Sequence, residues 1–366
     1  MNIFIYGTLR DPIVFRNLTG TDLNGVPFDL RGFRVDRVKD SDLPMILPSA
    51  DLVATGLLLR DPDPEVIDRL HAYEVPFGYV PVTLDQDGQS VTYYQPPEGQ
   101  QTSGQLWDLA VWQSESALPA QFAAAEIRSI NPPLTGDQLV AQWGMIQHRA
   151  HAAARAATHS APSTVRRDAG RAEVVNNRLI AGDFFRFRGV DLRYETFDGG
   201  VTDPLPREVF QGGEAALILP YDPVRDTVLL VEQFRVGSFF RGDGNSWMLE
   251  PVAGLIDAGE TPCEAAIREC AEEANVTPSH VELMFGAYPS PGGSTEYHHC
   301  FVGIVDLPES DSYFGGLEDE AEDLKLHVLP FERVMELVTT GEICVLPLIG
   351  MLYWLDRNRA RLRPAG

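Results

Sequence analysis

The feature that most constrains this chain is a stretch of 23 residues, 254–276, in which glycine, glutamate and arginine recur at fixed positions. It reads GLIDAGETPCEAAIRECAEEANV. Thr261 can begin a helix there, because its hydroxyl accepts a hydrogen bond from the first helical turn, and Pro262 fits the first helical position. The pattern therefore predicts a loop bounded by Gly254 and Gly259, followed by a helix.

The charged residues of the predicted helix are spaced by single turns. Glu269 and Glu273 lie one turn apart, as do Arg268 and Glu272. Carboxylates crowded on one turn repel each other unless a cation lies among them. Oxygen ligation of this kind suits Mg²⁺ or Mn²⁺, which also binds substrate phosphates. The alternative is an acidic, solvated helix with one ion pair, but the spacing of the glycines and glutamates favours the metal site.

The composition limits the classes of function. The chain has 366 residues, enough for two domains, and a formal net charge of −24 that argues against nucleic-acid or anionic-membrane partners. Its first ten residues contain no charged segment before the short apolar run, which predicts a strand and not a signal peptide. The four cysteines show no paired spacing, so a reducing, cytoplasmic setting is expected.

The chain divides by pattern into four sections. Residues 1–112 are rich in strand patterns, including a hairpin signal at Asp87-Gly88. Residues 113–157 are helical and rich in alanine, and residues 158–170 have the composition of a linker. Residues 171–366 read as strands that lead to the stretch at 254–276. We expect an α+β protein of two domains, with a helical extension and a linker between them.

The stretch at 254–276 resembles the Nudix box, G-x5-E-x7-R-E-U-x-E-E-x-G-U, where U is aliphatic. Two positions differ. Cys270 replaces an aliphatic residue, and a buried thiol packs as a small hydrophobic group. Asn275 replaces the last glycine, and asparagine is the next most tolerant residue of a left-handed backbone. The resemblance implies that residues 171–366 form a Nudix α/β/α sandwich.

The residues around the box are similar to the ADP-ribose (ADP-sugar) pyrophosphatase subfamily, most clearly in the segments EQFR at 232–235 and SPGG at 290–293. The resemblance implies a set of site residues in this chain. The implied metal ligands are the Ala253 carbonyl, Glu269 and Glu273. The implied substrate contacts are Arg207 and Arg235. The implied catalytic carboxylates are Glu296, as the base that activates water, and the box glutamate Glu272.

A second resemblance covers about the first 110 residues. The segment Tyr6-Gly7-Thr8-Leu9 and the later Glu74 look like the γ-glutamylcyclotransferase-like family, which implies a mixed β-barrel with helices. In that family the turn at residues 6–9 binds substrate through backbone N–H groups. Glu74 falls on the acid/base position, which shuttles a proton during intramolecular attack on an amide. The alternative is that Gly7 serves a turn and Glu74 only ends a helix, which leaves a binding or assembly module.

Together the resemblances imply an Mg²⁺- or Mn²⁺-dependent hydrolase that cleaves ADP-ribose to AMP and ribose 5-phosphate. It is fused to a cyclotransferase-like domain whose activity the residues leave open. A different nucleoside diphosphate derivative, such as NADH or a GDP-sugar, is one alternative, and a module that binds ADP-ribose without cleaving it is another. The subfamily resemblance also implies a homodimer through the Nudix domain, with the strands of residues 174–209 exchanged between copies.

Overall fold

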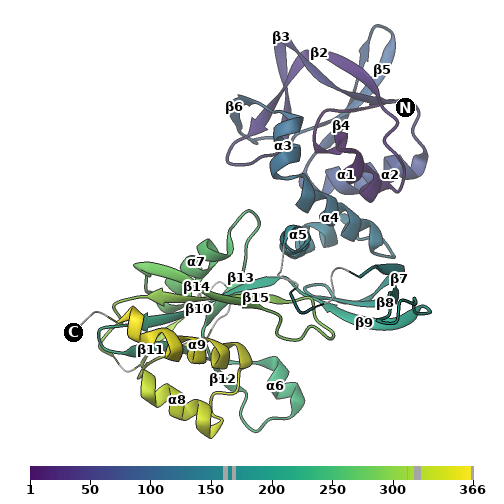
Figure 1. Ribbon diagram of the computed structural model, residues 1–366. Helices are drawn as coiled ribbons and strands as arrows, with labels where there is room; N and C mark the ends of the chain where they lie inside the picture. The colour runs from purple at the N-terminus through teal and green to yellow at the C-terminus, as the bar shows by residue number, and fades with distance from the viewer. Residues whose placement is uncertain (160–163, 167–169, 311, 317–322, 364–366) are drawn as a thin grey trace. The chain divides into compact units, whose positions relative to one another are not determined.

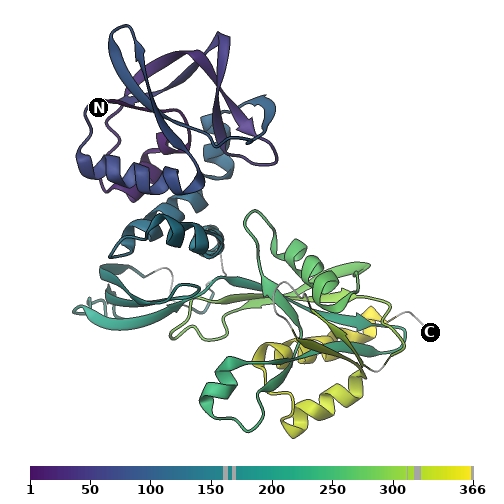
Figure 2. The same ribbon diagram turned by 180° about the vertical axis from the view of Figure 1, so that it is seen from behind.

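The computed structural model describes residues 1–159, 164–166, 170–310, 312–316 and 323–363, and it divides into two compact units, Met1–Glu208 and Val209–Gly366. Figures 1 and 2 show the helices and strands from opposite sides. Each unit has hydrophobic cores of its own. The expected class, α+β with two domains, is therefore confirmed.

A mixed six-stranded sheet forms the centre of the first unit. Its order is β4-β5-β1-β3-β2-β6, with β1 parallel to β5 and the other neighbours antiparallel. The strands are β1 (Ile3–Ile5), β2 (Val26–Val38), β3 (Pro44–Leu59), β4 (Val80–Gln86), β5 (Gln89–Gln95) and β6 (Thr102–Leu106). Alternation along the chain places Ile3 and Ile5 in one core and Phe4 and Tyr6 in another, so both faces of the sheet are covered.

Several helices of this unit begin at a residue whose side chain caps them. The helices are η1 (Thr8–Arg10), α1 (Pro12–Thr19), α2 (Pro64–Glu74), η2 (Val75–Phe77), α3 (Leu109–Glu115), α4 (Ala117–Ser129) and α5 (Gly136–Thr158). Asp11 caps α1 by accepting hydrogen bonds from two backbone N–H groups of the first turn. Thr135 and Gln138 form a capping box at the start of α5.

The hairpin predicted at Asp87-Gly88 is present between β4 and β5. Both turn residues have positive φ, 57° for Asp87 and 77° for Gly88. This backbone matches the twist of the paired strands, and only residues such as glycine, asparagine and aspartate adopt it readily. The turn could be predicted because two neighbouring residues determine it.

Three more strands, β7 (Ala172–Ala181), β8 (Arg186–Tyr194) and β9 (Leu205–Gln211), form a separate sheet. A buried ion cluster joins β8 to α4 and α5. The carboxylate of Glu126 accepts hydrogen bonds from Arg149 at 2.6 Å and from Arg186 at 3.2 Å, and all three residues are buried. Charges removed from water require such partners, so the cluster determines where β8 lies on the two helices.

The division into compact units falls inside β9, because the ion cluster attaches β7 and β8 to the first unit. The predicted domain limits at 112, 157 and 170 stay predictions, since compactness reflects contacts and does not mark where a homologous domain begins. Of the predicted linker at 158–170, the structure describes residues 158–159, 164–166 and 170.

An eight-stranded mixed sheet forms the centre of the second unit. Its order is β14-β15-β10-β11-β17-β16, with β12 paired to β11 and β13 paired to β10. β10 is parallel to β15, and the other pairs are antiparallel. The strands are β10 (Glu214–Asp222), β11 (Thr227–Phe234), β12 (Trp247–Glu250), β13 (Val252–Leu255), β14 (His280–Ala287), β15 (Tyr297–Ile304), β16 (Ser312–Gly315) and β17 (Leu324–Pro330).

Alternation along β10 divides the core of the second unit into two layers. Ala216 and Ile218 pack with α7 (Pro262–Ala274), whereas Leu217, Leu219 and Tyr221 pack with α8 (Phe331–Thr340) and α9 (Leu346–Leu362). The short α6 (Val236–Arg241) follows β11. Helices therefore cover both faces of the sheet, as Figure 2 shows, and the expected α/β/α sandwich is confirmed.

Helix α7 begins and ends where its sequence predicts. The hydroxyl of Thr261 accepts from the Glu264 N–H at 3.3 Å, and the Glu264 carboxylate accepts from the Thr261 N–H at 2.9 Å. Asn275 ends the helix with φ 54°, the left-handed conformation expected at this position. Cys270 is fully buried, and this burial raises the pKa of its thiol to about 12.

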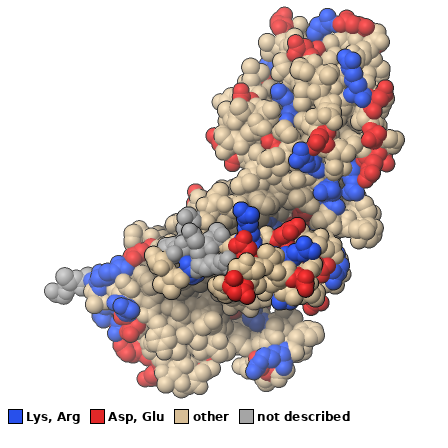
Figure 3. Space-filling model, turned by 45° about the vertical axis from the view of Figure 1, so that its right-hand side comes forward, with Lys and Arg blue, Asp and Glu red and all other residues tan. Residues whose placement is uncertain are grey.

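The surface in Figure 3 carries acidic and basic side chains interspersed with each other. Among the residues that the structure describes, no helix combines the length and the apolar character needed to cross a membrane.

Candidate functional site

Arg268 forms the centre of the carboxylate cluster on α7. Its Nη1 donates to Glu269 at 2.7 Å and to Glu272 at 2.9 Å. Its Nε and Nη2 donate to the two oxygens of Glu260, each at 3.0 Å. Burial by itself would raise the pKa of Glu260, but the hydrogen bonds and charge of Arg268 and a hydrogen bond from the Asp257 N–H together outweigh it, and the pKa is lowered. The arginine therefore stabilises the anionic form of Glu260 and offsets part of the charge of the cluster.

Gly254, the first residue of the box, lies directly against Glu269. A Cβ atom at position 254 would lie 1.8 Å from Glu269 Oε1 and 2.1 Å from its Cδ. No side chain fits there while the carboxylate keeps its position, so the close approach is the reason for glycine. Strand β13 pairs Gly254 with Ala216 of β10, which anchors the loop of the box to the sheet.

Glu273 lies beside the same loop. It is 3% exposed, and its Oε2 accepts a hydrogen bond from the Ala253 N–H at 3.3 Å. Ala253 precedes Gly254 in β13, and Glu269 is one turn from Glu273 on α7. The structure thus brings together the three residues predicted as metal ligands, although their ligand role stays a prediction.

The donors at this loop fit a hard divalent cation. The Ala253 carbonyl and the carboxylates of Glu269 and Glu273 supply only oxygen. Mg²⁺ commonly binds through one or two carboxylates together with waters and substrate phosphates. When bound here, such a cation would supply positive charge beside the phosphate oxygens. In the part of the chain that the structure describes, no three acidic, histidine or cysteine side chains form a group that could hold a metal ion by themselves.

Glu296 lies in the loop between β14 and β15. The Ser294 hydroxyl donates a hydrogen bond to the Glu296 carboxylate at 3.0 Å. The backbone N–H of Glu296 donates in turn to Ser294 Oγ at 3.1 Å. Phe210 anchors the loop by donating its N–H to the Gly293 carbonyl at 2.8 Å. Strand β15 runs along one edge of β10 and β13 along the other. The start of β10 therefore has Glu296 at one edge and Gly254 at the other.

The two arginines predicted to contact substrate differ in their surroundings. Arg235 precedes α6 and forms an ion pair with Glu250 at 2.6 Å, while 44% of its side chain is exposed. Burial raises the pKa of Glu250 even with this arginine beside it. Arg207 belongs to the part of β9 in the first unit, where it is exposed and donates to the Pro206 carbonyl at 2.8 Å. Substrate binding by either arginine stays a prediction.

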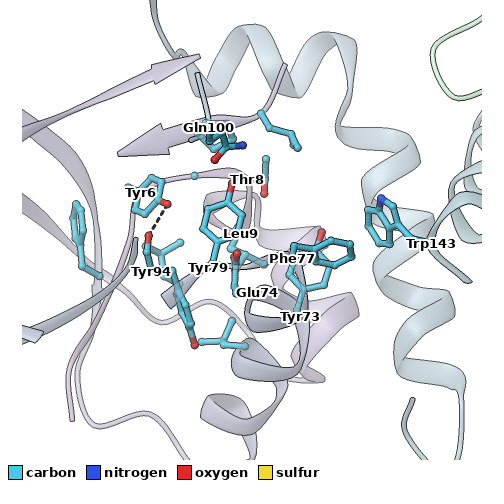
Figure 4. A pocket seen from close by; sticks show the side chains of 16 residues that line it. Tyr6, Thr8, Leu9, Tyr73, Glu74, Phe77, Tyr79, Tyr94, Gln100 and Trp143 are labelled. Carbon is cyan, nitrogen blue, oxygen red and sulfur yellow. Dashed lines mark hydrogen bonds between the residues drawn. The ribbon is translucent and has the colours of Figure 1, made fainter. Parts of the chain in front are cut away.

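A cavity of about 300 Å³ lies in the first unit, beside α2 (Figure 4). Every residue that the sequence predicted for this site lines it, namely Tyr6, Gly7, Thr8, Leu9 and Glu74. The wall is largely aromatic and includes Tyr73, Phe77, Tyr79, Tyr94 and Trp143, with the amide of Gln100 at one side. The structure thus brings these predicted residues together, and their roles in binding and catalysis stay predictions.

Glu74 points into this cavity from the end of α2 (Figure 4). Among the described residues, none donates a hydrogen bond to its carboxylate, and burial raises the pKa of Glu74 to about 7. Burial, and then the charge of Glu74, raise the pKa values of Tyr6 and Tyr79. The Tyr6 hydroxyl donates to the Tyr94 carbonyl at 2.8 Å. A carboxyl that titrates near neutral pH is suited to accept a proton and return it.

The sequence reasoning missed the part of this pocket that comes from α5. The indole of Trp143 lies 4.9 Å from the ring of Phe77, measured between ring centroids. The available signal was an apolar stripe at helical spacing, Leu139, Trp143 and Ile146. Such a stripe predicts a buried face, but it does not tell which core that face meets.

Glu250 was missed as well, as the partner of Arg235. The ion pair joins the end of β11 to β12, which are antiparallel neighbours. Pairing between strands depends on register, and no local pattern in the sequence supplies the register of these two strands.

Comparison with known families matches two separate parts of the chain. Residues 213–346 match the NUDIX domain, and residues 3–113 match the family described as gamma-glutamyl cyclotransferase, AIG2-like. Both resemblances expected from the sequence are therefore confirmed.

Individual relatives match the C-terminal half. An ADP-ribose pyrophosphatase of Haemophilus influenzae is 33% identical over 194 residues, which cover 52% of this chain and 88% of that protein. An ADP-ribose pyrophosphatase of Escherichia coli K12 is 34% identical over 191 residues, 52% of this chain and 90% of that protein. A GDP-mannose pyrophosphatase of Salmonella paratyphi B is 36% identical over 171 residues, 46% of this chain and 87% of that protein. The chain therefore belongs to the Nudix family that contains these pyrophosphatases, and it carries an AIG2-like γ-glutamyl cyclotransferase domain in addition.

Proposed function

We propose that the Nudix domain hydrolyses ADP-ribose to AMP and ribose 5-phosphate with Mg²⁺ or Mn²⁺ as cofactor. The observation that carries the proposal is the close approach of Glu269 to Gly254, next to the contact of Ala253 with Glu273, which places the oxygen donors of these residues side by side. The relatives named ADP-ribose pyrophosphatase, which match this chain over 88% and 90% of their length, support the choice of substrate.

In the proposed reaction, water attacks one phosphorus atom while the bond from that phosphorus to the bridging oxygen breaks. Glu296 accepts the proton of the water, with Glu272 as the second candidate for this role. Glu296 lies on a loop that contains Gly292 and Gly293, and such a loop can move when substrate binds. Arg235 and Arg207 bind phosphate oxygens and the adenosine part, because a guanidinium pairs with phosphate through two hydrogen bonds.

The test is a panel of ADP-ribose, GDP-mannose and NADH, offered to the full chain with Mg²⁺ and, in parallel, with excess EDTA. Chromatography of the nucleotide products measures cleavage. We expect the highest kcat/KM for ADP-ribose and no cleavage in EDTA. A preference for GDP-mannose or NADH would reassign the substrate. Binding of ADP-ribose without product would indicate a sensing module, and full activity in EDTA would refute the role of the metal.

We also infer a homodimer formed through the Nudix section, with residues 174–209 exchanged between copies. Large apolar side chains exposed on this segment support it, since burial in an interface would remove them from water. Val174 is 58% exposed, Phe197 93% and Val201 65%. Sedimentation of a single species at monomer mass over micromolar concentrations would contradict this inference.

The setting that we propose is the cytoplasm, with small-molecule partners and neither nucleic acid nor membrane. The four cysteines are free thiols, which suits a reducing compartment. The formal net charge of −24 opposes binding to phosphate backbones and anionic lipids. Fractionation of cells that express the full chain would test the location.

A second candidate function belongs to the pocket of the first unit, and it is the cyclisation of a γ-glutamyl compound to 5-oxoproline. The observation that favours it is Glu74, with a pKa of about 7 in an aromatic pocket. The α-amino nitrogen of the substrate attacks the γ-carbonyl carbon, and the amide C–N bond breaks. Glu74 accepts the proton of the attacking amine and returns it to the departing nitrogen.

Incubation of the full chain with γ-glutamyl peptides and γ-glutamyl amines tests this second function. We expect 5-oxoproline, measured by mass spectrometry, together with an equal amount of free amine. If no such compound yields 5-oxoproline, the activity is refuted and the domain is a binding or assembly module.

A further inference from the structure

We propose that Trp143 of α5 forms, with Phe77 and Tyr73, an aromatic subsite in the pocket of the first unit. This subsite selects ligands that carry an uncharged aromatic or branched aliphatic group beside the part bound at Glu74. For the γ-glutamyl part of the ligand the proposal rests on the second proposed function. It goes beyond that function by naming a specificity residue and a chemical preference.

Trp143 lies outside the segment that matches the AIG2-like family. That match ends at residue 113, whereas α5 begins at Gly136 and its indole still lines the cavity. Helix α5 comes close to η2 at its first residue, Gly136, where a Cβ atom would lie 3.3 Å from Pro76 Cγ. A helix that follows the homologous domain therefore supplies one wall of its pocket, so the preference of this chain need not follow that of the family.

The three rings form one apolar wall. The Trp143 and Phe77 rings meet edge to face at 4.9 Å and 61°, and Trp143 and Tyr73 do so at 6.3 Å and 69°. Such arrangements are attractive beyond the burial of area. In Figure 4, Phe77 and Tyr73 lie between Glu74 and Trp143, so the wall extends from the carboxyl outward.

Another side of α5 is held by buried polar contacts, which keep the wall in place. Gln142, the neighbour of Trp143, donates to Asp183 at 3.0 Å and accepts from Arg186 at 2.7 Å. Two turns further along, Arg149 is bound to Glu126 at 2.6 Å. A residue on a helix anchored in this way cannot move aside at low cost, so the indole restricts which groups fit.

The chemistry of the wall favours an uncharged group. Of the residues that line this cavity, Glu74 is the one with an ionisable carboxylate, and the rings of Tyr73, Phe77 and Trp143 carry no formal charge at neutral pH. A charged group placed against them loses its water shell, and for an ammonium group the attraction to the ring faces offsets only part of that loss. An aromatic or branched aliphatic group instead gains contact with three rings.

The test is isothermal titration of the full chain in a Glu74→Gln background, in which turnover should be slow. The probes are γ-glutamylbenzylamine, γ-glutamylmethylamine and γ-glutamyl-(4-aminobutyl)amine, which carries an ammonium group. We expect the benzyl compound to bind at least about tenfold more tightly than either of the others. Trp143→Ala should remove most of this ratio, and Trp143→Phe should keep part of it. Met145→Ala, a truncation on the same helix that does not line the cavity, should leave the ratio unchanged.

Equal binding of the three probes, tighter binding of the ammonium compound, no binding at all, or an unchanged ratio in Trp143→Ala would each overturn the proposal. Thermal unfolding shows whether the variants fold. If Trp143→Ala does not, Trp143→Leu keeps apolar volume without the indole and decides the question. A benzyl preference without any 5-oxoproline from the wild type would refute the cyclotransferase function and keep the subsite. Release of 5-oxoproline without a benzyl preference would refute the subsite and keep the cyclotransferase function.

Discussion

The two carboxylate sites of this protein are built in opposite ways. At α7 three glutamates surround the guanidinium of Arg268, which pairs with Glu260 just before the helix and with Glu269 and Glu272 on it. In the pocket of the first unit, Glu74 lies among aromatic rings, where burial raises its pKa to about 7. The first arrangement stabilises the anionic form of Glu260, and the second stabilises the neutral form of Glu74.

This difference indicates what each site can do. A divalent cation with a bound diphosphate requires oxygens that are already negative, and an arginine among the glutamates lets them approach one another. Proton transfer at neutral pH requires instead a group that gains and loses its proton near pH 7. One residue type thus serves two kinds of chemistry, and its surroundings decide which.

The largest expected effect concerns the metal that we propose at α7. Removal of divalent cations with EDTA should abolish ADP-ribose hydrolysis, and Glu273→Gln should lower kcat by at least about a hundredfold, because one negative oxygen beside the transition state is lost. Steady-state kinetics at saturating Mg²⁺ measure this. Glu336→Gln, on the exposed surface of α8, serves as the control and should leave kcat unchanged. A Glu273→Gln enzyme with wild-type kcat would show that the site on α7 does not depend on the negative charge of Glu273.

The next effect concerns proton transfer in the pocket. Glu74→Gln should lower the rate of 5-oxoproline release by about a hundredfold, because an amide cannot carry the proton from one nitrogen to the other. ADP-ribose hydrolysis by the same protein should not change. Glu65→Gln, on the exposed side of α2, is the matched control. If Glu74→Gln releases 5-oxoproline at the wild-type rate, the pocket does not use this carboxyl as an acid or base.

A smaller effect is expected when the cation of the cluster is removed. Arg268→Met leaves Glu260, Glu269 and Glu272 without their shared partner, so their repulsion should displace Glu269 from Gly254 and lower kcat/KM by about tenfold. Arg268→Lys should retain part of the activity, since it keeps the charge but loses the forked geometry. Arg333→Met on α8, which breaks an exposed pair, is the control. Unchanged kcat/KM in Arg268→Met would show that the arginine does not organise the cluster.

The smallest effect is a dependence of stability on pH in the first unit. The ordinary pKa of Glu74 is 4.5 and its folded pKa is about 7. The favourable contribution of its protonated form is fully present below pH 4.5 and is lost as pH rises through 7. Relative to wild type, Glu74→Gln should therefore gain about 1–2 kcal/mol of stability between pH 5 and pH 8, less than the full shift allows because the side chain is partly exposed.

Hydrogen exchange of the α2 amides, followed by mass spectrometry in wild type and Glu74→Gln, measures this difference region by region. The amides of α7 provide the internal control, since Glu74 belongs to the other compact unit. A stability difference that stays constant from pH 5 to pH 8 would mean that Glu74 titrates at its ordinary pKa. The contrast between the two carboxylate sites would then fail.

Local features of both sites could be predicted from the sequence because each depends on a few neighbouring residues. The cap at Thr261, the left-handed end at Asn275 and the turn at Asp87-Gly88 are of this kind. The same holds for the spacing that puts Glu269 and Glu273 on one side of a helix.

What only the tertiary structure decided are the contacts between residues far apart in the chain. The pKa of Glu74 depends on burial among rings from several elements, and α5 contributes Trp143 to that pocket from about 70 residues further along the chain. The attachment of β8 to α4 through Glu126 and Arg186 is of the same kind. Burial and ion pairing depend on which surfaces meet, and a linear pattern shows that a face is apolar or charged without showing its partner. The sequence by itself therefore determined the helices, turns and spacing of the glutamates, and the packing of distant segments determined the charge state and the walls of the sites.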